Sequence, residues 1–443
     1  MQEKSMNQTK SSLKPFFVIW SGQSVSLLGS QLVQFALIWW LTQTTGSATV
    51  LAMASLVGLV PQVVLGPFVG VLVDRWSRRY TMLLADSSVA LATLVLAYLY
   101  WIDVAQIWHI FVILFIRALA GSFHWPAMQS STSLMVPEEH LTRIQGLNQT
   151  MQGGLNIASA PLGALLLGIM PIQGILAIDV VTAVFAIVPL FFVPIPQPSK
   201  RAKDGDTAVP QTSFGTDLRE GLRYAWSWPG MMLIMGMATL INLVLTPAFT
   251  LLPLLITNHF GGSAIQLGGI EATFGVGIVV GGLLLGTWGG FKRRILTTLT
   301  GLIGMGIATV LIGLAPANLF VVAIVGAFGV GAMQAIVNGP IQAIFQAAVE
   351  PEMQGRMFTL IGSLAAAMSP FGLIIAGPVA DALGVRTWYI VGGCVTLLMG
   401  IVGFFIPAAL AIEAGHPNKS TPQPSNETTE TAVPLPVART INL

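Results

Sequence analysis

The sequence predicts an all-α polytopic membrane protein with twelve transmembrane helices. Of its 443 residues, 54% are hydrophobic and only 9% are charged, whereas about 25% of the residues of a soluble domain are charged. From Pro15 to Val73 there is no charged residue at all. Because one bilayer crossing takes roughly 20 apolar residues, a run of this length crosses the membrane twice. This composition excludes a soluble globular protein.

Polar turns divide the rest of the chain into further apolar segments of spanning length. The predicted spans cover residues 16–41, 48–73, 80–101, 107–127, 146–169, 174–195, 230–256, 265–288, 295–315, 319–345, 357–382 and 387–410. The first of them lacks the short core and cleavage pattern of a signal peptide, so we expect it to be retained as a membrane span.

The segment 196–228 interrupts the apolar pattern with prolines and many charged residues. We predict that it is a cytoplasmic central linker, with a short surface helix from Thr216 to Trp226. It joins an N-terminal six-helix bundle, residues 1–195, to a C-terminal six-helix bundle, residues 229–412. The tail, residues 413–443, is rich in Pro, Thr and Asn and is predicted to be a disordered cytoplasmic segment.

Lysine and arginine residues predict the orientation in the membrane. If the N-terminus lies inside, 18 of the 20 basic residues fall in inner segments, and only Arg117 and Arg386 do not. Cytoplasmic loops carry this excess of Lys and Arg. We therefore expect both termini to be cytoplasmic.

The two predicted bundles share motifs at corresponding places. Residues 136–139 (V-P-E-E) in the first half correspond to residues 349–352 (V-E-P-E) in the second, and residues 160–163 (A-P-L-G) correspond to 369–372 (S-P-F-G). Such repeats predict two pseudo-symmetric halves of the same orientation. A transporter that rocks two halves around a substrate held near the middle of the membrane needs this arrangement.

A charged hairpin separates the second and third predicted spans. From Gly70 to Arg79 it reads G-x-L-x-D-R-x-x-R-R, which resembles the loop between helices 2 and 3 of the major facilitator superfamily. The resemblance implies the major facilitator fold and a gating motif that consists of Gly70, Asp74, Arg75, Arg78 and Arg79. In that motif Asp74 lies at the N-terminal end of helix 11, where the helix dipole favours an anion, and Arg75 and Arg78 complete a cytoplasmic latch. A plain charge cluster that sets topology is the simpler alternative.

Four charged residues stand out inside the predicted spans: Asp86, Arg117, Asp179 and Glu271. A charge at the centre of a bilayer costs about 2.5–3.5 kcal/mol on insertion scales, so such residues usually face a partner or a wet cavity. We therefore treat all four as candidates for substrate binding or proton coupling.

Arg117 belongs to a segment that resembles the R-x-x-x-G pattern of helix 4 in the superfamily, where the arginine is linked to proton coupling. An arginine keeps its charge and cannot carry the proton itself, so it would stabilise the ionised form of a neighbouring carboxylate. A static ion pair that holds the helices together is the equal alternative.

Glu271 is our first choice for the group that takes up a proton or attracts a cationic amine drug, because the superfamily fold places its helix beside the central cavity. The alternative is an exposed glutamate near the outer interface. For Asp86 and Asp179 we expect structural roles, with Asp86 paired to Arg75, Arg78 or Arg79, and a proton relay is the sharper alternative.

Glycines recur at four-residue spacing in the eighth predicted span, as two overlapping G-x-x-x-G patterns formed by Gly277, Gly281, Gly282 and Gly286. This spacing usually lets a neighbouring membrane helix approach closely. We predict a packing function for them.

Enzyme and metal signatures do not occur in the sequence. There is no G-x-x-x-x-G-K-[ST] loop for a nucleotide, the five histidines are scattered over span ends and loops without metal-ligand spacing, and Cys394 is the single cysteine. We expect neither an enzyme nor a cofactor. No basic run suggests a nucleic-acid partner.

Several segments resemble bacterial macrolide-efflux permeases, a group within the superfamily. They include residues 20–27, 45–48, 66–75, 134–139 and 282–286. The resemblance implies a secondary exporter in the bacterial plasma membrane that moves a small amphipathic drug, a macrolide antibiotic, against protons by alternating access. It leaves open a separate ATP-binding partner. Export of a siderophore or another secreted metabolite, and a non-transporting sensor or scaffold, are the alternatives.

Overall fold

The computed structural model describes residues 13–196, 223, 226–349 and 351–414. Within these ranges the chain is helical and contains no strand. Twelve of the helices are long and apolar enough to cross a membrane, which confirms the predicted fold class. The predicted disordered tail beyond residue 414 and almost all of the predicted linker helix lie outside the described residues.

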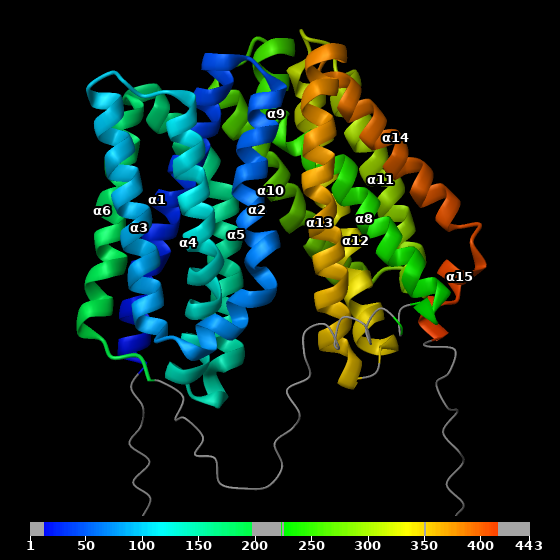
Figure 1. The fold of residues 1–443 in the computed structure, drawn as a ribbon. Coiled ribbons are helices and arrows are strands. Elements are labelled where there is room, and N and C mark those ends of the chain that lie inside the picture. The colour runs from blue at the N-terminus through cyan, green and yellow to red at the C-terminus, as the bar shows by residue number, and fades with distance from the viewer. Residues whose placement is uncertain (1–12, 197–222, 224–225, 350, 415–443) are drawn as a thin grey trace, which may run out of the picture.

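Among the described residues, fourteen α-helices make up the two halves (Figure 1). The first half contains α1 (Lys14–Thr45), α2 (Ala48–Arg75), α3 (Arg78–Trp101), α4 (Ile107–Met135), α5 (Glu138–Ile169) and α6 (Ile172–Phe192). The second half contains α8 (Pro229–Thr250), α9 (Leu252–Leu254), α10 (Ala264–Trp288), α11 (Arg294–Leu314), α12 (Phe320–Ala348), α13 (Pro351–Leu383), α14 (Val385–Gly403) and α15 (Pro407–Leu410).

Several helices are longer than the apolar segments that predicted them. The fourth predicted span ends at residue 127, but α4 continues to Met135, and α5 begins at Glu138 instead of residue 146. Polarity marks where the hydrocarbon core ends, whereas a helix continues as long as its backbone hydrogen bonds do. The last span is shorter than predicted: α14 ends at Gly403 and a new helix starts at Pro407, which has no amide hydrogen for a continuing helix.

Helix packing repeats between the two halves. α2 packs against α4 as α10 packs against α12, α3 against α6 as α11 against α14, and α1 against α5 as α8 against α13. The contacts between the halves are symmetric as well, because α2 meets α13 and α5 meets α10. This pattern agrees with the sequence repeat.

Both halves begin and end at the same end of the molecule, which we call the linker end; it is the bottom of Figure 1. The opposite end is called the far end. Contacts between the halves lie towards the far end: Gly377 of α13 lies against Thr49 of α2, and Gly268 of α10 lies against Ala160 of α5. The two bundles lean together there and apart at the linker end (Figure 1).

Glycines of α10 divide into a packed pair and an open pair. A Cβ atom at Gly277 would overlap the carbonyl oxygen of Phe328, and one at Gly281 would overlap that of Ala332, so both glycines let α12 approach α10. Gly282 and Gly286 would meet nothing within 4 Å. The predicted packing function is therefore confirmed for the first pair alone.

Candidate functional site

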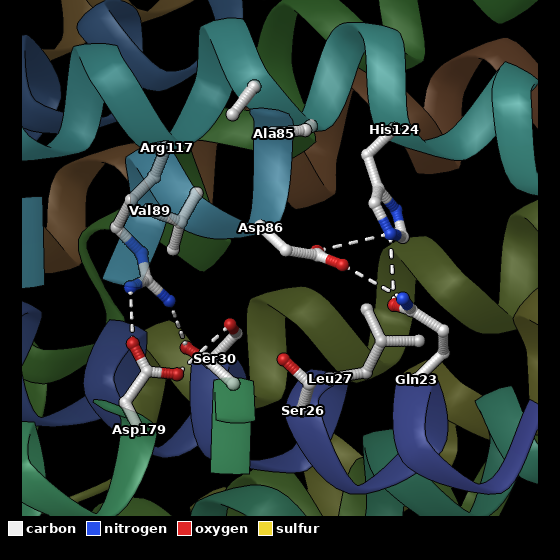
Figure 2. Close-up of a pocket in the computed structure, with 13 residues that line it drawn as sticks. Gln23, Ser26, Leu27, Ser30, Ala85, Asp86, Val89, Arg117, His124 and Asp179 are labelled. Carbon is white, nitrogen blue, oxygen red and sulfur yellow. Dashed lines mark hydrogen bonds and ion pairs between the residues drawn. The ribbon is translucent and has the colours of Figure 1, made fainter. Parts of the chain in front are cut away.

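A polar cavity of about 170 Å³ lies inside the first bundle, between α1, α3, α4 and α6. Figure 2 shows that it brings together three of the four predicted charged residues, Asp86, Arg117 and Asp179. Glu271 belongs to the other half and does not reach it. Sequence spacing explains part of this arrangement, because Arg117, Gly121 and His124 are four and three residues apart and share one face of α4.

A glycine brings α1 close enough to α6 to complete the cavity. A Cβ atom at Gly29 would overlap Oγ1 of Thr182 and lie 3.2 Å from Oδ1 of Asp179. Without that atom the next residue, Ser30, can place its hydroxyl 3.1 Å from Oδ1 of Asp179.

Arg117 and Asp179 form a buried ion pair that several neighbouring groups support with hydrogen bonds. Nη1 of Arg117 lies 2.7 Å from Oδ2 of Asp179 and donates to Oγ1 of Thr93 at 3.0 Å, while Nη2 donates to the carbonyl oxygen of Ser30 at 2.9 Å. Thr93 also donates to Asp179 at 3.1 Å. The side chain of Asp179 is only 1% exposed. These bonds join α1, α3, α4 and α6, as the static alternative for Arg117 supposes.

Asp86 forms a second group with Gln23 and His124. Nε2 of Gln23 donates to Oδ2 of Asp86 at 2.8 Å, and Nε2 of His124 lies 3.2 Å from Oδ1 of Asp86 and 2.9 Å from Oε1 of Gln23. The side chain of Asp86 is 11% exposed, which makes it more accessible than Asp179. We had counted His124 among scattered histidines; its position seven residues, or about two turns, after Arg117 was the signal that it shares the same face.

The expected pairing of Asp86 with the hairpin arginines is not what the structure contains. Arg78 instead donates to Oγ of Ser130 at 2.9 Å, and Arg79 donates to the carbonyl oxygens of Leu190 and Phe191 at the end of α6. The reason is distance along α3, since seven or eight residues span about 11–12 Å. Arg79 therefore neutralises the carbonyl end of α6 within its own bundle.

The predicted latch can be followed only in part. The side chains of Asp74 and Arg75 lie outside the described part of the structure, so the contact between Asp74 and the second half stays a prediction. Trp76, the hairpin residue that directly follows α2, stacks on Phe123 of α4 with a centroid distance of 5.7 Å.

Glu271 lies two turns into α10, at the boundary between the halves. Gly268 and Gly275, three residues before and four residues after Glu271, contact Ala160 and Ile157 of α5. Glu271 therefore lies on the side of α10 that faces α5. Its side chain is half-buried rather than exposed and has no hydrogen bond or ion pair among the described residues. Glu271 interacts electrostatically with Tyr389 of α14, whose hydroxyl donates to the carbonyl oxygen of Ala248 at 2.5 Å.

A clasp between the halves, which the sequence did not reveal, closes the far end. Asp381, near the end of α13, accepts hydrogen bonds from the N-terminus of α2: from the amides of Ala48 and Thr49 at 2.7 and 3.0 Å, and from the hydroxyls of Ser47 and Thr49 at 3.1 and 2.7 Å. A carboxylate stabilises the unpaired amides and positive dipole end of a helix. Here that carboxylate comes from the opposite half of the molecule.

Comparison with known proteins identifies related transporters. Residues 11–437 match the model of a family described as "Transmembrane secretion effector". The chain is 36% identical over 387 residues to Macrolide efflux protein A of Streptococcus pyogenes, across 87% of this chain and 94% of that protein. It is 28% identical over 400 residues to the Multidrug efflux pump Tap of Mycolicibacterium fortuitum, across 86% and 92%. The solved structure of the nucleoside transporter NupG aligns with a TM-score of 0.65 and 14% identity over 87% of this chain and 98% of that chain, which concerns the fold alone.

Proposed function

Because the chain belongs to the major facilitator superfamily, in the family described as transmembrane secretion effectors, and is a multi-pass efflux transporter rather than an enzyme, we propose that it exports macrolide-type amphipathic drugs in exchange for protons. The observation that carries the exchange of protons is the cavity of the first bundle, where the partly exposed Asp86 lies beside the buried ion pair of Arg117 and Asp179. The cargo follows from the resemblance to Macrolide efflux protein A.

Alternating access supplies the route for the drug. The bundles meet at the far end and lean apart at the linker end, and the distribution of Lys and Arg assigns the linker end to the cytoplasm. This state takes up drug from inside. The cavity of about 170 Å³ in the first bundle is smaller than the roughly 300–1,000 Å³ of drug sites, so it serves the proton, and the drug binds between the bundles.

Two carboxylates have separate roles in coupling drug export to proton uptake. Asp86 responds to protons in the first bundle, and Glu271, half-buried and without a hydrogen-bonding partner among the described residues, attracts the cationic amine of the drug at the boundary. A membrane potential of 100 mV is worth about 2.3 kcal/mol per charge moved, or roughly fifty-fold accumulation. A cycle that moves one net charge, which for a cationic drug means more protons than drug charges, gains this much without an ATP-binding partner, whereas a one-for-one exchange draws on the pH difference alone.

Efflux of labelled erythromycin from energised cells tests this proposal. We expect efflux that a protonophore abolishes, that is lost in Asp86→Asn, and that is strongly reduced in Glu271→Gln. Glu139→Gln is the matched control, because the Glu139 side chain is 76% exposed and lies outside the cavity. Purified protein in liposomes with an imposed proton gradient and no ATP should export the drug as well.

The outcomes separate the parts of the proposal. Efflux kept in Glu271→Gln but lost in Asp86→Asn would place the coupling in the first bundle alone. Efflux that survives the protonophore would contradict proton antiport. No efflux of erythromycin from well-expressed protein would contradict the macrolide cargo, and siderophores and other secreted metabolites would be assayed next.

The far-end clasp is expected to hold the cytoplasm-open state. Asp381→Asn removes the charge that accepts from α2, and losing a helix cap of this kind costs about 1 kcal/mol, which is roughly a fivefold shift in a two-state ratio. The Asp381 side chain is exposed, so salt screens part of this effect. Spin labels at Gln43 and Leu383, on opposite halves in a Cys394→Ser background, should report a larger share of long distances in the variant. Unchanged distance distributions would show that the clasp does not bias the equilibrium.

A further inference from the structure

We propose that His124 holds the exchanged proton of the first bundle, with Asp86 as its counter-ion. This inference rests on the proposed proton exchange and names the atom that accepts the proton. Neither the resemblance to efflux proteins nor the predicted site residues include this histidine. Its place in the cavity carries the argument (Figure 2).

Hydrogen bonding determines which ring nitrogen of His124 carries the hydrogen. The amide nitrogen of Gln23 donates to Asp86, so the amide oxygen of Gln23 faces His124. Nε2 of His124 therefore has two acceptors beside it, the Gln23 oxygen at 2.9 Å and the Asp86 carboxylate at 3.2 Å. An imidazole nitrogen between two acceptors must be the donor. Nε2 thus carries a hydrogen in this arrangement as long as Asp86 is ionised.

The other ring nitrogen, Nδ1, is left to accept a proton. Nδ1 makes no hydrogen bond within the described part of the chain, and it is not one of the buried side-chain atoms there that lack a partner. It is therefore open to solvent, and His124 lines the cavity. A proton from water in the cavity binds at Nδ1, and the same N–H bond breaks when the proton returns to water. No other bond changes, and Nε2 keeps its hydrogen bonds to α1 and α3 throughout.

The charges around His124 favour one exchangeable proton. The ionisable groups that face it are Asp86 from α3, Arg117 from α4 itself and Asp179 from α6. From α1 the residue that faces His124 is the uncharged Gln23. Residues 48–73 of α2 contain no ionisable group, and Arg78 of α3 contacts Ser130 further towards the linker end. With a neutral imidazole these groups sum to one negative charge, and the proton on Nδ1 cancels it. A second proton would leave an uncompensated positive charge beside Arg117 inside the helix bundle, which is costly.

Vesicle transport measures the consequence directly. With a pH difference of one unit and no membrane potential, one exchanged proton supports about a tenfold drug gradient. We expect inverted vesicles to reach this erythromycin gradient with the unchanged protein and with His140→Gln, whose histidine side chain is 38% exposed and lies away from the cavity. In His124→Gln the gradient should fall to near unity. A gradient that stays about tenfold in His124→Gln would overturn the inference while the proposed export stands.

Carbon-13 NMR of the histidine Cε1 atoms in detergent provides a readout that does not depend on transport. Among the resonances of the five histidines, that of His124 is the one lost in His124→Gln. If His124→Gln fails to fold, Gln23→Met, which removes one acceptor of Nε2, identifies the His124 resonance by its shift. We expect the chemical shift of this resonance to respond to proton binding, and the response to change in Asp86→Asn but not in Glu139→Gln. A resonance that does not titrate overturns the inference. Should the unchanged protein export no erythromycin, the proposed function fails and the titration alone decides where the proton binds.

Discussion

Replacement of Arg117 by alanine is expected to lower the stability of the folded protein by about 3–5 kcal/mol, the usual cost of breaking a buried ion pair from one side. The physical reason is what remains behind. Asp179 is 1% exposed and would lose its charged partner, 2.7 Å away, while Ser30 and Thr93 would still hold the carboxylate in place. Thermal unfolding of the purified protein in detergent, followed by tryptophan fluorescence, measures the change.

A double variant shows whether the loss comes from the uncompensated charge. Arg117→Met with Asp179→Asn removes both charges and keeps the approximate shapes, so it should recover most of the stability that Arg117→Ala loses. If Arg117→Ala were as stable as the unchanged protein, the pair would contribute nothing to stability. If the double variant were as unstable as Arg117→Ala, lost packing rather than charge would be the cause.

Substitution by alanine at two neighbouring glycines of α10 should change the stability of the protein in opposite directions. Gly281→Ala places a Cβ atom over the carbonyl oxygen of Ala332 and 2.7 Å from its Cα, and because backbone atoms cannot rotate away, α10 and α12 must separate. Overpacking of this kind costs about 1–3 kcal/mol. Gly282→Ala meets nothing within 4 Å and should gain up to about 1 kcal/mol from the better helix propensity of alanine.

Melting temperatures of the two alanine variants, measured side by side in the same detergent, test the packing of α10 on α12. We expect Gly281→Ala to melt well below the unchanged protein and Gly282→Ala to melt at or above it. Equal melting temperatures for both variants would contradict the close approach of these two helices.

Much of the fold follows from local properties that a single chain displays. Apolar runs of spanning length predicted twelve membrane helices, because in a bilayer the backbone must satisfy its own hydrogen bonds and a helix does so within one segment. The charges inside those runs predicted a functional site, since each is costly there without a partner. Three of the four, Asp86, Arg117 and Asp179, lie in one cavity.

The ends of helices were less well predicted, because hydropathy and backbone bonding end at different places. The polar residues that follow position 127 leave the apolar pattern, but they continue α4 to Met135. At the other end of the chain, the apolar residues up to position 410 include Pro407, which interrupts the last long helix.

By itself, then, the sequence determined that this is a twelve-helix membrane protein with a repeat, a charged hairpin and four intramembrane charges, because length, polarity and spacing along one helix are local quantities. Only the tertiary structure decided the partners. Arg117 and Asp179 are 62 residues apart, His124 and Gln23 are 101 apart, and Asp381 binds an α2 amide 333 positions away. Such pairs form where packed helices bring side chains that are remote in sequence to the same level along the bundle. The close approach of α1 to α6 at Gly29 and the packing of α2 on α13 determine these levels, and no pattern along the chain does so.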